Sequence, residues 1–595
     1  MPNLKCEMLN IYPNRMDRTV LKIAGESGMG LLSVGKVVAK ILKGMGYYVH
    51  SDREFPSLIK GGHSNMQIDF GLKPIRSLSR HADLVIALDK EGLVEYVDAV
   101  GEGGVIVHGY ERYDRIPGLQ EKAKQRKVRL LYLPAHTIVR SFGGNDLMVN
   151  MVLLGLMWRV LGLPLKPLED AVREQFAKKP VLLEIDLKCV RAGHEAKGLG
   201  KIPDYKIQLP KSKPKEILID GNMGIALGAI KAGVRAYYMY PMSPASSILT
   251  YLANFSHETG MLIKQAEDEI TAAQMSLGSM FMGTRSFTAT SGGGFDLMTE
   301  TVSLAGIMEN PLVIVLAQRP GPGTGLPTWT GQGDLKMAIH SSHGEFAKII
   351  LAASDPLSAY ELIQQALNLA EKFQTPVIVL SEKTVCEAQM MVDLDKAEKI
   401  PIERSLVTSK KELASLKSSD RFKITESGVS KRWAPGTSAT GYYGNGDEHR
   451  EDGTLTEDGP EIEAIMAKRI RKIATIKDAL PDPVIYGPKK AALSLVGWGS
   501  SKNAVLDAMG LLAERGIKIN YLHYEYLWPI RHEAFAKFAK ENKDIHILEG
   551  NAQGLLADIL EGKSGLKFKG RLLKYDGRPF FRRDVTDYVL KNLKT

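Results

Sequence analysis

The sequence predicts a multidomain α/β protein, and three observations lead to that prediction. The chain has 595 residues, which at about 100 to 200 residues per domain gives several structural units. Short apolar runs alternate with segments of helical period, a pattern typical of parallel sheets covered by helices. With 44% hydrophobic and 25% charged residues, the composition is that of a globular protein rather than of a disordered or fibrous chain.

Changes in this pattern along the chain predict its domain boundaries. Three α/β segments are separated by a Lys- and Pro-rich linker and by a charged, irregular excursion that contains one long basic helix around residues 461–478. The expected order is a first domain at 1–205, a linker at 206–215, a second domain at 216–395, the excursion at 396–485 and a third domain at 486–595.

Charge and cysteine content exclude several classes of protein. The formal net charge is +10, but the basic residues are scattered, and we expect the cluster at 122–129 to be a solvated helix face rather than a nucleic-acid site. The longest apolar stretch, 147–158, is shorter than the ~20 residues that cross a bilayer, so we expect a cytoplasmic protein that binds neither membrane nor nucleic acid. Cys6, Cys189 and Cys386 are too few and too far apart for a disulfide framework, a zinc module or a [4Fe–4S] cluster made by this chain alone.

Two loops of the first domain have the composition of an anion site. A glycine-rich turn from Gly25 to Gly30 lies between a predicted strand and a predicted helix, where free backbone N–H groups suit a phosphate. A purely structural turn is the alternative, and a dinucleotide fingerprint is weakened because Ser33 stands at the third glycine position. The second loop, residues 55–65, contains one cation, two glycines and hydroxyl groups, and an ordinary turn is again the alternative. The candidate ligand-binding residues of this domain are Gly25, Gly28, Gly30, Lys60, Gly61, Gly62 and Ser64.

The second domain places polar groups after consecutive predicted strands. Ser243 lies between two prolines, the turn Thr290-Ser291-Gly292-Gly293-Gly294 follows the next strand, and Arg319 begins a Pro- and Gly-rich loop after another. Since open α/β sheets bind ligands at the carboxyl ends of their strands, these loops predict a site. An arginine there suits bidentate binding of a carboxylate.

Three acidic residues at the start of a predicted helix add to this set. Glu267, Asp268 and Glu269 could simply complement the helix dipole. Glu267 and Glu269 are expected on nearly opposite helix faces, so that at most one of them reaches a given ligand.

These motifs together resemble the α subunit of 2-oxoacid:ferredoxin oxidoreductases. The resemblance rests on YPMSPAS, where the family usually has YPITP, and on QAEDE, TATSGGG and QRPGPGTGLPT, in that order. The first 200 residues, with GESGMG and EFPSLIKGGHSN, are similar to the family's γ domain, and GWGSS from Gly497 is similar to its transketolase C-terminal-type domain. The resemblance covers nearly the whole chain and implies a γ domain, a pyrimidine-type thiamine-diphosphate domain and a transketolase C-terminal-like domain.

The resemblance also implies an activity and residue roles. It implies thiamine-diphosphate-dependent conversion of a 2-oxoacid and coenzyme A, with ferredoxin as electron carrier, most similar to the enzymes that act on 2-oxoglutarate. Glu267 would bind pyrimidine N1′, with Glu269 as the alternative, and the turn Thr290–Gly293 would approach the aminopyrimidine. Ser243 would bind the keto oxygen or carboxylate, and Arg319 would hold the carboxylate. The γ-like domain would bind coenzyme A.

Two features of this family are absent from the chain. The sequence has neither the G-D-G motif with a following Asn that binds Mg²⁺ and diphosphate nor cysteines for a cluster, so a β subunit is expected to supply both, in an (αβ)₂ assembly. We therefore expect no metal site in this chain. Pyruvate or a branched-chain 2-oxoacid as substrate, a non-catalytic positioning subunit and an NAD-linked dehydrogenase are the alternatives.

Overall fold

The computed structural model describes residues 18–57, 62–199, 202, 205 and 207–593. The chain forms two compact units. The first consists of residues 1–218 with 388–393, and the second of residues 219–387 with 394–595. Within the described residues, no helix is both long and apolar enough to span a bilayer.

The first unit contains a mixed sheet with the strand order β6-β5-β4-β1-β3-β2-β14-β7. Its elements are β1 (Thr19–Glu26), α2 (Leu31–Met45), β2 (Tyr48–Glu54), β3 (His63–Gly71), β4 (Ala82–Ala87), α3 (Lys90–Ala99), β5 (Val100–His108), η2 (Tyr113–Arg115), α4 (Leu119–Gln125), β6 (Arg129–Tyr132), α5 (Ala135–Ser141), η3 (Asp146–Met148), α6 (Val149–Leu161), α7 (Leu165–Phe176), α8 (Pro180–His194), β7 (Ile217–Ile219) and β14 (Gln389–Val392).

The expectation of a parallel first sheet is correct for only half of it. Strands β1, β4, β5 and β6 are parallel neighbours, as the alternation of strands and helices predicts. Strand β3 pairs antiparallel with both β1 and β2, and β14 pairs antiparallel with β2. The strand–helix alternation does not apply here, because β2 and β3 follow each other without a helix between them and β14 joins the sheet from more than 300 residues further along the chain.

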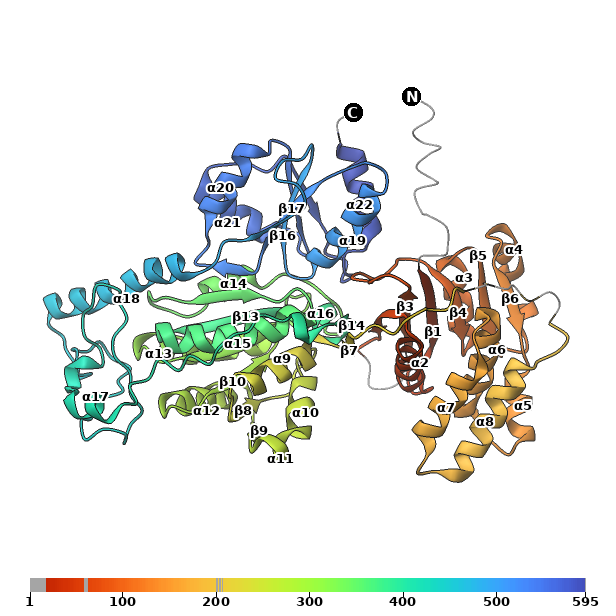
Figure 1. The fold of residues 1–595 in the computed structure, drawn as a ribbon, viewed down its shortest axis with the longest axis horizontal. Helices are drawn as coiled ribbons and strands as arrows, with labels where there is room; N and C mark the ends of the chain where they lie inside the picture. The colour runs from red at the N-terminus through yellow and green to blue at the C-terminus, as the bar shows by residue number, and fades with distance from the viewer. Residues whose placement is uncertain (1–17, 58–61, 200–201, 203–204, 206, 594–595) are drawn as a thin grey trace. The chain divides into compact units, whose positions relative to one another are not determined.

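Helices α6 and α8 pack against each other through two glycines (Figure 1). A Cβ atom at Gly155 would lie 2.1 Å from the Val190 carbonyl oxygen, and one at Gly193 would lie 1.9 Å from the Val152 carbonyl oxygen. Only glycine permits this approach of the two backbones. Almost every residue of α6 is therefore buried.

The second unit begins with a sheet of strand order β18-β12-β13-β11-β10-β8-β9. Up to residue 396 its elements are α9 (Gly221–Lys231), β8 (Ala236–Met239), α10 (Ser247–Asn254), α11 (Ser256–Thr259), β9 (Leu262–Gln265), α12 (Glu269–Phe281), β10 (Ser286–Thr290), α13 (Gly292–Ile307), β11 (Leu312–Gln318), α14 (Leu335–His340), β12 (Ile349–Ala352), α15 (Pro356–Phe373), β13 (Pro376–Glu382), α16 (Lys383–Glu387) and η4 (Leu394–Lys396).

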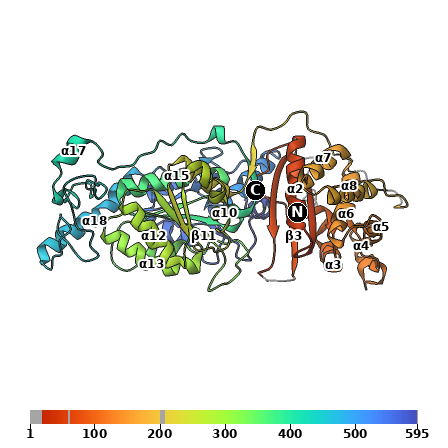
Figure 2. The same ribbon diagram turned by 90° about the horizontal axis from the view of Figure 1, so that it is seen from below.

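Helices cover both faces of this sheet. Along β11, Val313 and Val315 belong to the core that includes α9 and α15, whereas Ile314 and Leu316 belong to the core that includes α12 and α13. Alternate side chains of a strand point to opposite faces, so a strand buried on both faces must be apolar throughout. Figure 2 shows α15 on one side of β11 and α12 and α13 on the other.

The C-terminal part of the second unit forms a smaller sheet of order β15-β17-β16-β19-β20. The remaining elements are α17 (Lys410–Ser415), η5 (Ser418–Asp420), α18 (Gly459–Ala479), β15 (Val484–Tyr486), β16 (Ser494–Trp498), α19 (Ser501–Ala513), β17 (Asn520–Tyr524), β18 (Tyr526–Trp528), α20 (His532–Glu541), β19 (Ile545–Glu549), α21 (Leu555–Ser564), β20 (Gly570–Leu573) and α22 (Arg582–Asn592). Strand β18 pairs antiparallel with β12, so the C-terminal part supplies an edge strand to the first sheet of this unit.

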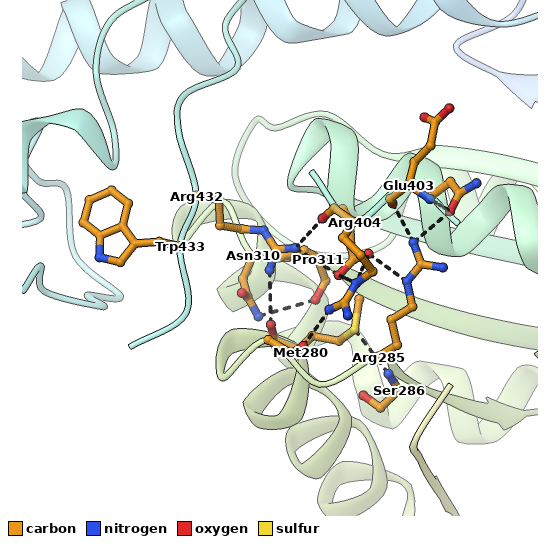
Figure 3. Close-up of polar contacts among 12 residues, drawn as sticks. Met280, Arg285, Ser286, Asn310, Pro311, Glu403, Arg404, Arg432 and Trp433 are labelled. Carbon is orange, nitrogen blue, oxygen red and sulfur yellow. Dashed lines mark hydrogen bonds and ion pairs between the residues drawn. The ribbon is translucent and has the colours of Figure 1, made fainter. Parts of the chain in front are cut away.

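One buried carboxylate fastens the excursion to the second unit. Glu371 on α15 accepts hydrogen bonds from Arg285 at 2.7 Å and from Arg404 at 2.9 Å. It also accepts one from Arg432 at 3.0 Å. Arg404 and Arg432 belong to the excursion, and Figure 3 shows both arginines approaching Arg285. Because Glu371, Arg285 and Arg432 are almost fully buried, these charges depend on one another for compensation.

Replacing Glu371 with glutamine should therefore destabilise the second unit. The substitution leaves buried guanidinium groups without their counter-charge, and we expect the free energy of unfolding to fall by about 3 to 5 kcal/mol. Urea unfolding followed by circular dichroism measures the change. Glu533→Gln is the matched control, because that carboxylate is 61% exposed and pairs with Lys477 at the surface. Equal unfolding midpoints for the two variants would contradict the anchoring role.

Candidate functional site

The carboxyl ends of neighbouring parallel strands form one edge of the central sheet of the second unit. Strands β9, β8, β10 and β11 lie side by side in that order, and each pairs parallel with its neighbour. The polar loops predicted in the second domain all follow these strands. The sheet therefore collects them at one edge, as the sequence predicts.

The loop after β8 is held by a buried asparagine. Asn222 donates from Nδ2 to the carbonyl oxygen of Pro244 at 2.8 Å and to Ser247 Oγ at 2.7 Å. The peptide between Ser243 and Pro244 is cis. Ser243 is exposed, so its hydroxyl is available to a ligand.

Arg319 and Ser243, separated by 76 positions in the chain, are brought together. The Arg319 guanidinium donates to the carbonyl oxygen of Ser243 at 3.1 Å. Partial burial lowers the pKa of Arg319, and the nearby Asp334 carboxyl opposes that shift. This contact holds Arg319 at the carboxyl end of β11 and uses one N–H donor of its guanidinium. The planar guanidinium has further N–H donors, whose geometry suits a carboxylate.

The acidic motif differs from the expectation in one respect. Helix α12 begins only at Glu269, and Asp268 is its N-cap, accepting from the Thr271 backbone N–H at 2.7 Å. Glu267 therefore precedes the helix, where its side chain is exposed, whereas Glu269 is 3% exposed. The buried Oε1 of Glu269 has no hydrogen-bond partner within the described part of the chain. Buried carboxylate oxygens are normally hydrogen-bonded, so Glu269 has the environment of a ligand-binding group.

The three glycines after Ser291 lie between two acids. A Cβ atom at Gly294 would lie 2.7 Å from Glu269 Oε1 and 2.1 Å from Thr290 Oγ1. A Cβ atom at Gly292 would lie 3.3 Å from Asp334 Oδ2, and one at Gly293 would meet nothing within 4 Å. The start of α13 is thus open at its middle glycine, with Glu269 on one side and Asp334 on the other.

Two hydroxyl groups complete this turn. Thr290 is fully buried and its Oγ1 lies 3.9 Å from the Met242 sulfur. The Ser291 hydroxyl is also buried, and it has no hydrogen-bond partner among the described residues. The N-terminal N–H groups of a helix lack intrahelical acceptors, so the turn offers several donors to a bound molecule.

Asp334 is a residue of this site that the sequence analysis missed. Its backbone N–H donates to Gln318 Oε1 at 3.0 Å, which fixes it next to the end of β11. Burial raises the pKa of its carboxyl to about 6, with Asp296 adding to the rise and Arg319 opposing it. An acid directly after Gly331-Gln332-Gly333 was the available signal, but sequence spacing does not reveal burial.

The segment from Arg319 to Asp334 is fixed by Gln332. The Gln332 side chain donates to Glu382 Oε1 at 2.9 Å and accepts from the Gly550 N–H at 2.7 Å. Its backbone N–H donates to the Gly550 carbonyl oxygen at 2.8 Å. The Arg319 loop is therefore tied both to the end of β13 and to the C-terminal sheet.

In the first unit, the two candidate anion loops contact each other. The Ser27 N–H donates to the Gly62 carbonyl oxygen at 3.1 Å, and the Ser27 and Ser64 hydroxyl oxygens lie 2.6 Å apart.

Gly28 and Gly30 have φ values of 107° and 77°, which favour glycine. Gly25 lies at the end of β1, while Lys60 and Gly61 fall outside the described residues.

A cavity of about 290 Å³ opens beside this turn. Its walls are largely apolar and come mainly from α2, α6, α7 and α8, and Gly28 and Gly30 also line it. Asn150 and Asp186 also line it. Burial raises the pKa of the Asp186 carboxyl to about 6. The first unit thus combines an open helix N-terminus with an apolar cavity.

Two protein families match the chain. The family described as pyruvate flavodoxin/ferredoxin oxidoreductase, thiamine diphosphate-binding, matches residues 227–468, and the family described as pyruvate ferredoxin/flavodoxin oxidoreductase matches residues 20–196. The first match contains the loops of the central sheet and the second contains the Gly25–Gly30 turn.

Individual relatives align along nearly the whole chain. The 2-oxoacid:ferredoxin oxidoreductase subunit alpha of a Sulfolobus species is 30% identical over 629 residues, covering 96% of each chain. The 2-oxoglutarate oxidoreductase subunit KorA of Mycobacterium tuberculosis is 27% identical, covering 92% of this chain and 88% of the relative. Among solved structures, 2-oxoglutarate:ferredoxin oxidoreductase from Magnetococcus marinus, with 2-oxoglutarate, coenzyme A and succinyl-CoA bound, has a TM-score of 0.88 at 27% identity, covering 97% of this chain and all of that one.

The glycine turn allows a matched pair of substitutions. Gly294→Ala would place a methyl group within 2.7 Å of Glu269 Oε1, so we expect it to displace Glu269 and lower the melting temperature by several degrees. Gly293→Ala meets no atom within 4 Å and should leave stability unchanged or slightly higher, because alanine favours helices. Differential scanning fluorimetry of both variants checks this, and a melting temperature for Gly294→Ala equal to that of Gly293→Ala would refute the close packing.

Proposed function

The chain belongs to the family of 2-oxoacid:ferredoxin oxidoreductase alpha subunits, and from this we propose that its second unit binds thiamine diphosphate through Glu269 and a 2-oxoacid through Ser243 and Arg319. The proposed reaction interconverts 2-oxoglutarate, coenzyme A and oxidised ferredoxin with succinyl-CoA, carbon dioxide and reduced ferredoxin. The choice of 2-oxoglutarate is supported by the ligands named for the Magnetococcus marinus structure and by the name of the Mycobacterium relative.

The observation that carries the proposal is the unpaired oxygen of Glu269. The carboxyl is buried, and it faces a turn where only glycine fits. A protonated ring nitrogen or an amino group of the cofactor would supply the missing hydrogen bond. When bound, thiamine diphosphate provides the nucleophilic carbon needed to cleave the bond between the 2-oxo carbon and its carboxylate. Glu267 is the alternative for this role, but its exposed side chain suits it less.

The turn after β10 suits the same cofactor. Buried Thr290 and Ser291 leave hydroxyl groups at the strand end, and Gly292 and Gly293 bring backbone N–H groups to the surface of the turn. An aromatic ring can approach such a backbone closely because no Cβ intervenes.

The substrate groups lie on the neighbouring loops. Arg319 carries a permanent positive charge, so it would bind the carboxylate of the 2-oxoacid and orient it. The exposed Ser243 hydroxyl, beside Arg319, would donate a hydrogen bond to the keto oxygen. That donor gains strength as negative charge develops on the oxygen during the reaction.

We propose that the first unit binds coenzyme A. The Gly25–Gly30 turn and the described residues of the second loop, Gly62 and Ser64, offer backbone and hydroxyl donors to phosphates. The apolar cavity beside them could hold a less polar part of the molecule.

The proposal also requires a second polypeptide. A β subunit would carry the Mg²⁺–diphosphate site and a [4Fe–4S] cluster, in a cytoplasmic (αβ)₂ assembly that passes electrons to ferredoxin. The designation of the relatives as alpha subunits supports such a partner. Under this proposal the chain described here is part of the catalytic site and does more than position a partner.

Neutralising Glu269 tests the role in cofactor activation. In the chain co-expressed with its β subunit, Glu269→Gln should reduce coenzyme A-dependent viologen reduction by at least about 100-fold, because the carboxylate can no longer drive proton exchange on the cofactor. Glu267→Gln is the matched control and should keep near-normal turnover. The opposite result would assign the role to Glu267, and normal turnover in both variants, with intact assembly, would support a non-catalytic positioning subunit.

Removing Arg319 tests the carboxylate site. Arg319→Ala should raise KM for 2-oxoglutarate, pyruvate and 2-oxoisovalerate at least about tenfold, since one charge-assisted interaction contributes about 1.5 to 3 kcal/mol. Steady-state viologen reduction measures KM, with the exposed Arg235 changed to alanine as control. An unchanged KM would rule out this role, and a preference of the unchanged enzyme for pyruvate would replace 2-oxoglutarate as the substrate.

A further inference from the structure

In the described part of the chain, the Asp334 side chain lacks hydrogen bonds that a purely structural aspartate would make. It stands at the N-cap position of α14, but its side chain makes no capping hydrogen bond. Its Oδ2 atom is buried without a hydrogen-bond partner within the described residues. Buried carboxylate oxygens are costly to leave unpaired, so neither capping nor packing accounts for this side chain.

The place of Asp334 relates it to the substrate. Its Oδ2 lies against Gly292 at the start of α13, and its carboxyl is within electrostatic range of Arg319. Arg319 in turn contacts Ser243. A molecule bound between Arg319 and the open Gly293 would therefore have Asp334 as a neighbour.

The charged groups around Asp334 come from several elements. Arg319 follows β11 and Asp296 lies on α13, while Glu269 on α12 faces the other side of the glycine turn. Lys336, on α14 itself, is paired with Asp558 of α21 at 2.8 Å. Among the described residues, Arg319 is thus the cation whose charge acts on Asp334, and an incoming carboxylate would compete for it.

We infer that Asp334 is a further substrate-binding residue of this site. Asp334 lies beside the 2-oxoacid carboxylate at Arg319 and takes up one proton from solvent when that carboxylate binds. The inference rests on the proposed function, because it presumes a 2-oxoacid at Arg319. An ionised Asp334 repels the substrate carboxylate and shares Arg319 with it, whereas the neutral acid does neither and can donate a hydrogen bond to a carboxylate oxygen.

The direction of the pH dependence follows from burial. Since burial raises the pKa of Asp334 to about 6, the group is neutral below that pH and ionised above it. The affinity for a 2-oxoacid should therefore weaken as pH rises above about 6. The loss is at most about tenfold per pH unit, because one proton is involved.

The experiment measures binding rather than turnover. N-oxalylglycine, an unreactive analogue of 2-oxoglutarate, is titrated calorimetrically into the αβ holoenzyme between pH 5.5 and 8, in two buffers with different ionisation enthalpies. The unchanged enzyme should bind it about tenfold or more weakly at pH 8 than at pH 6, with a proton uptake approaching one per ligand at pH 7 to 8. Asp334→Asn should bind with nearly constant affinity across this range and without proton uptake, and therefore more tightly than the unchanged enzyme at pH 8.

A control and the contrary outcomes complete the design. Asp296→Asn removes a charge that raises the pKa of Asp334, so it should keep the pH dependence and move its midpoint to lower pH. The inference is overturned if Asp334→Asn takes up as many protons on binding as the unchanged enzyme does. It is also overturned if the unchanged enzyme itself binds N-oxalylglycine with an affinity that does not depend on pH. If N-oxalylglycine binds the unchanged enzyme at no pH, the proposed 2-oxoacid site fails together with the inference.

Discussion

The parallel pairing of four strands is the constraint on which the candidate site depends. Backbone hydrogen bonds align β9, β8, β10 and β11 so that all four end at one edge of the sheet. Ser243, the Thr290–Gly294 turn and Arg319 are far apart in sequence, and each loop alone has an unremarkable composition. Their proximity follows from the alignment of the strands. Burial fixes that alignment, since every residue of β11 is buried and all but its last are apolar.

Buried charge organises the parts of the second unit that have little regular structure. Between η4 and α18 the described residues form the short helices α17 and η5 and no strand of a sheet, so sheet pairing does not hold this segment in place. Arg404 and Arg432 supply specific attachment points on Glu371 instead. A second attachment follows the same principle, since Lys472 of α18 donates to the buried Glu309 at 2.6 Å. Such contacts specify position as much as they stabilise, because an unpaired buried charge penalises every alternative placement.

Sequence patterns were sufficient for the α/β class and for selecting the loops of the candidate site, because both depend on local periodicity and on turn residues. The patterns could not reveal pairings between distant segments, such as β14 with β2 or β18 with β12. They also could not separate Glu267 from Glu269, because the start of α12 decides which side chain is buried. Asp334 was missed for a related reason: its character comes from burial against Gly292 and from Arg319, neither of which is adjacent in sequence. The roles of all these residues remain predictions.

Strand β14 belongs to the first unit although it follows most of the central sheet of the second unit in the chain. The chain leaves the first unit near Leu218, returns for Ala388–Asp393, and leaves again. A single cut in the segment between α8 and β7 would therefore separate two polypeptides that still share one sheet, with β14 held by the hydrogen bonds to β2. If a gene were divided at that point, the two products would have to associate through the pairing of β14 with β2. In the single chain this pairing is intramolecular and therefore independent of protein concentration.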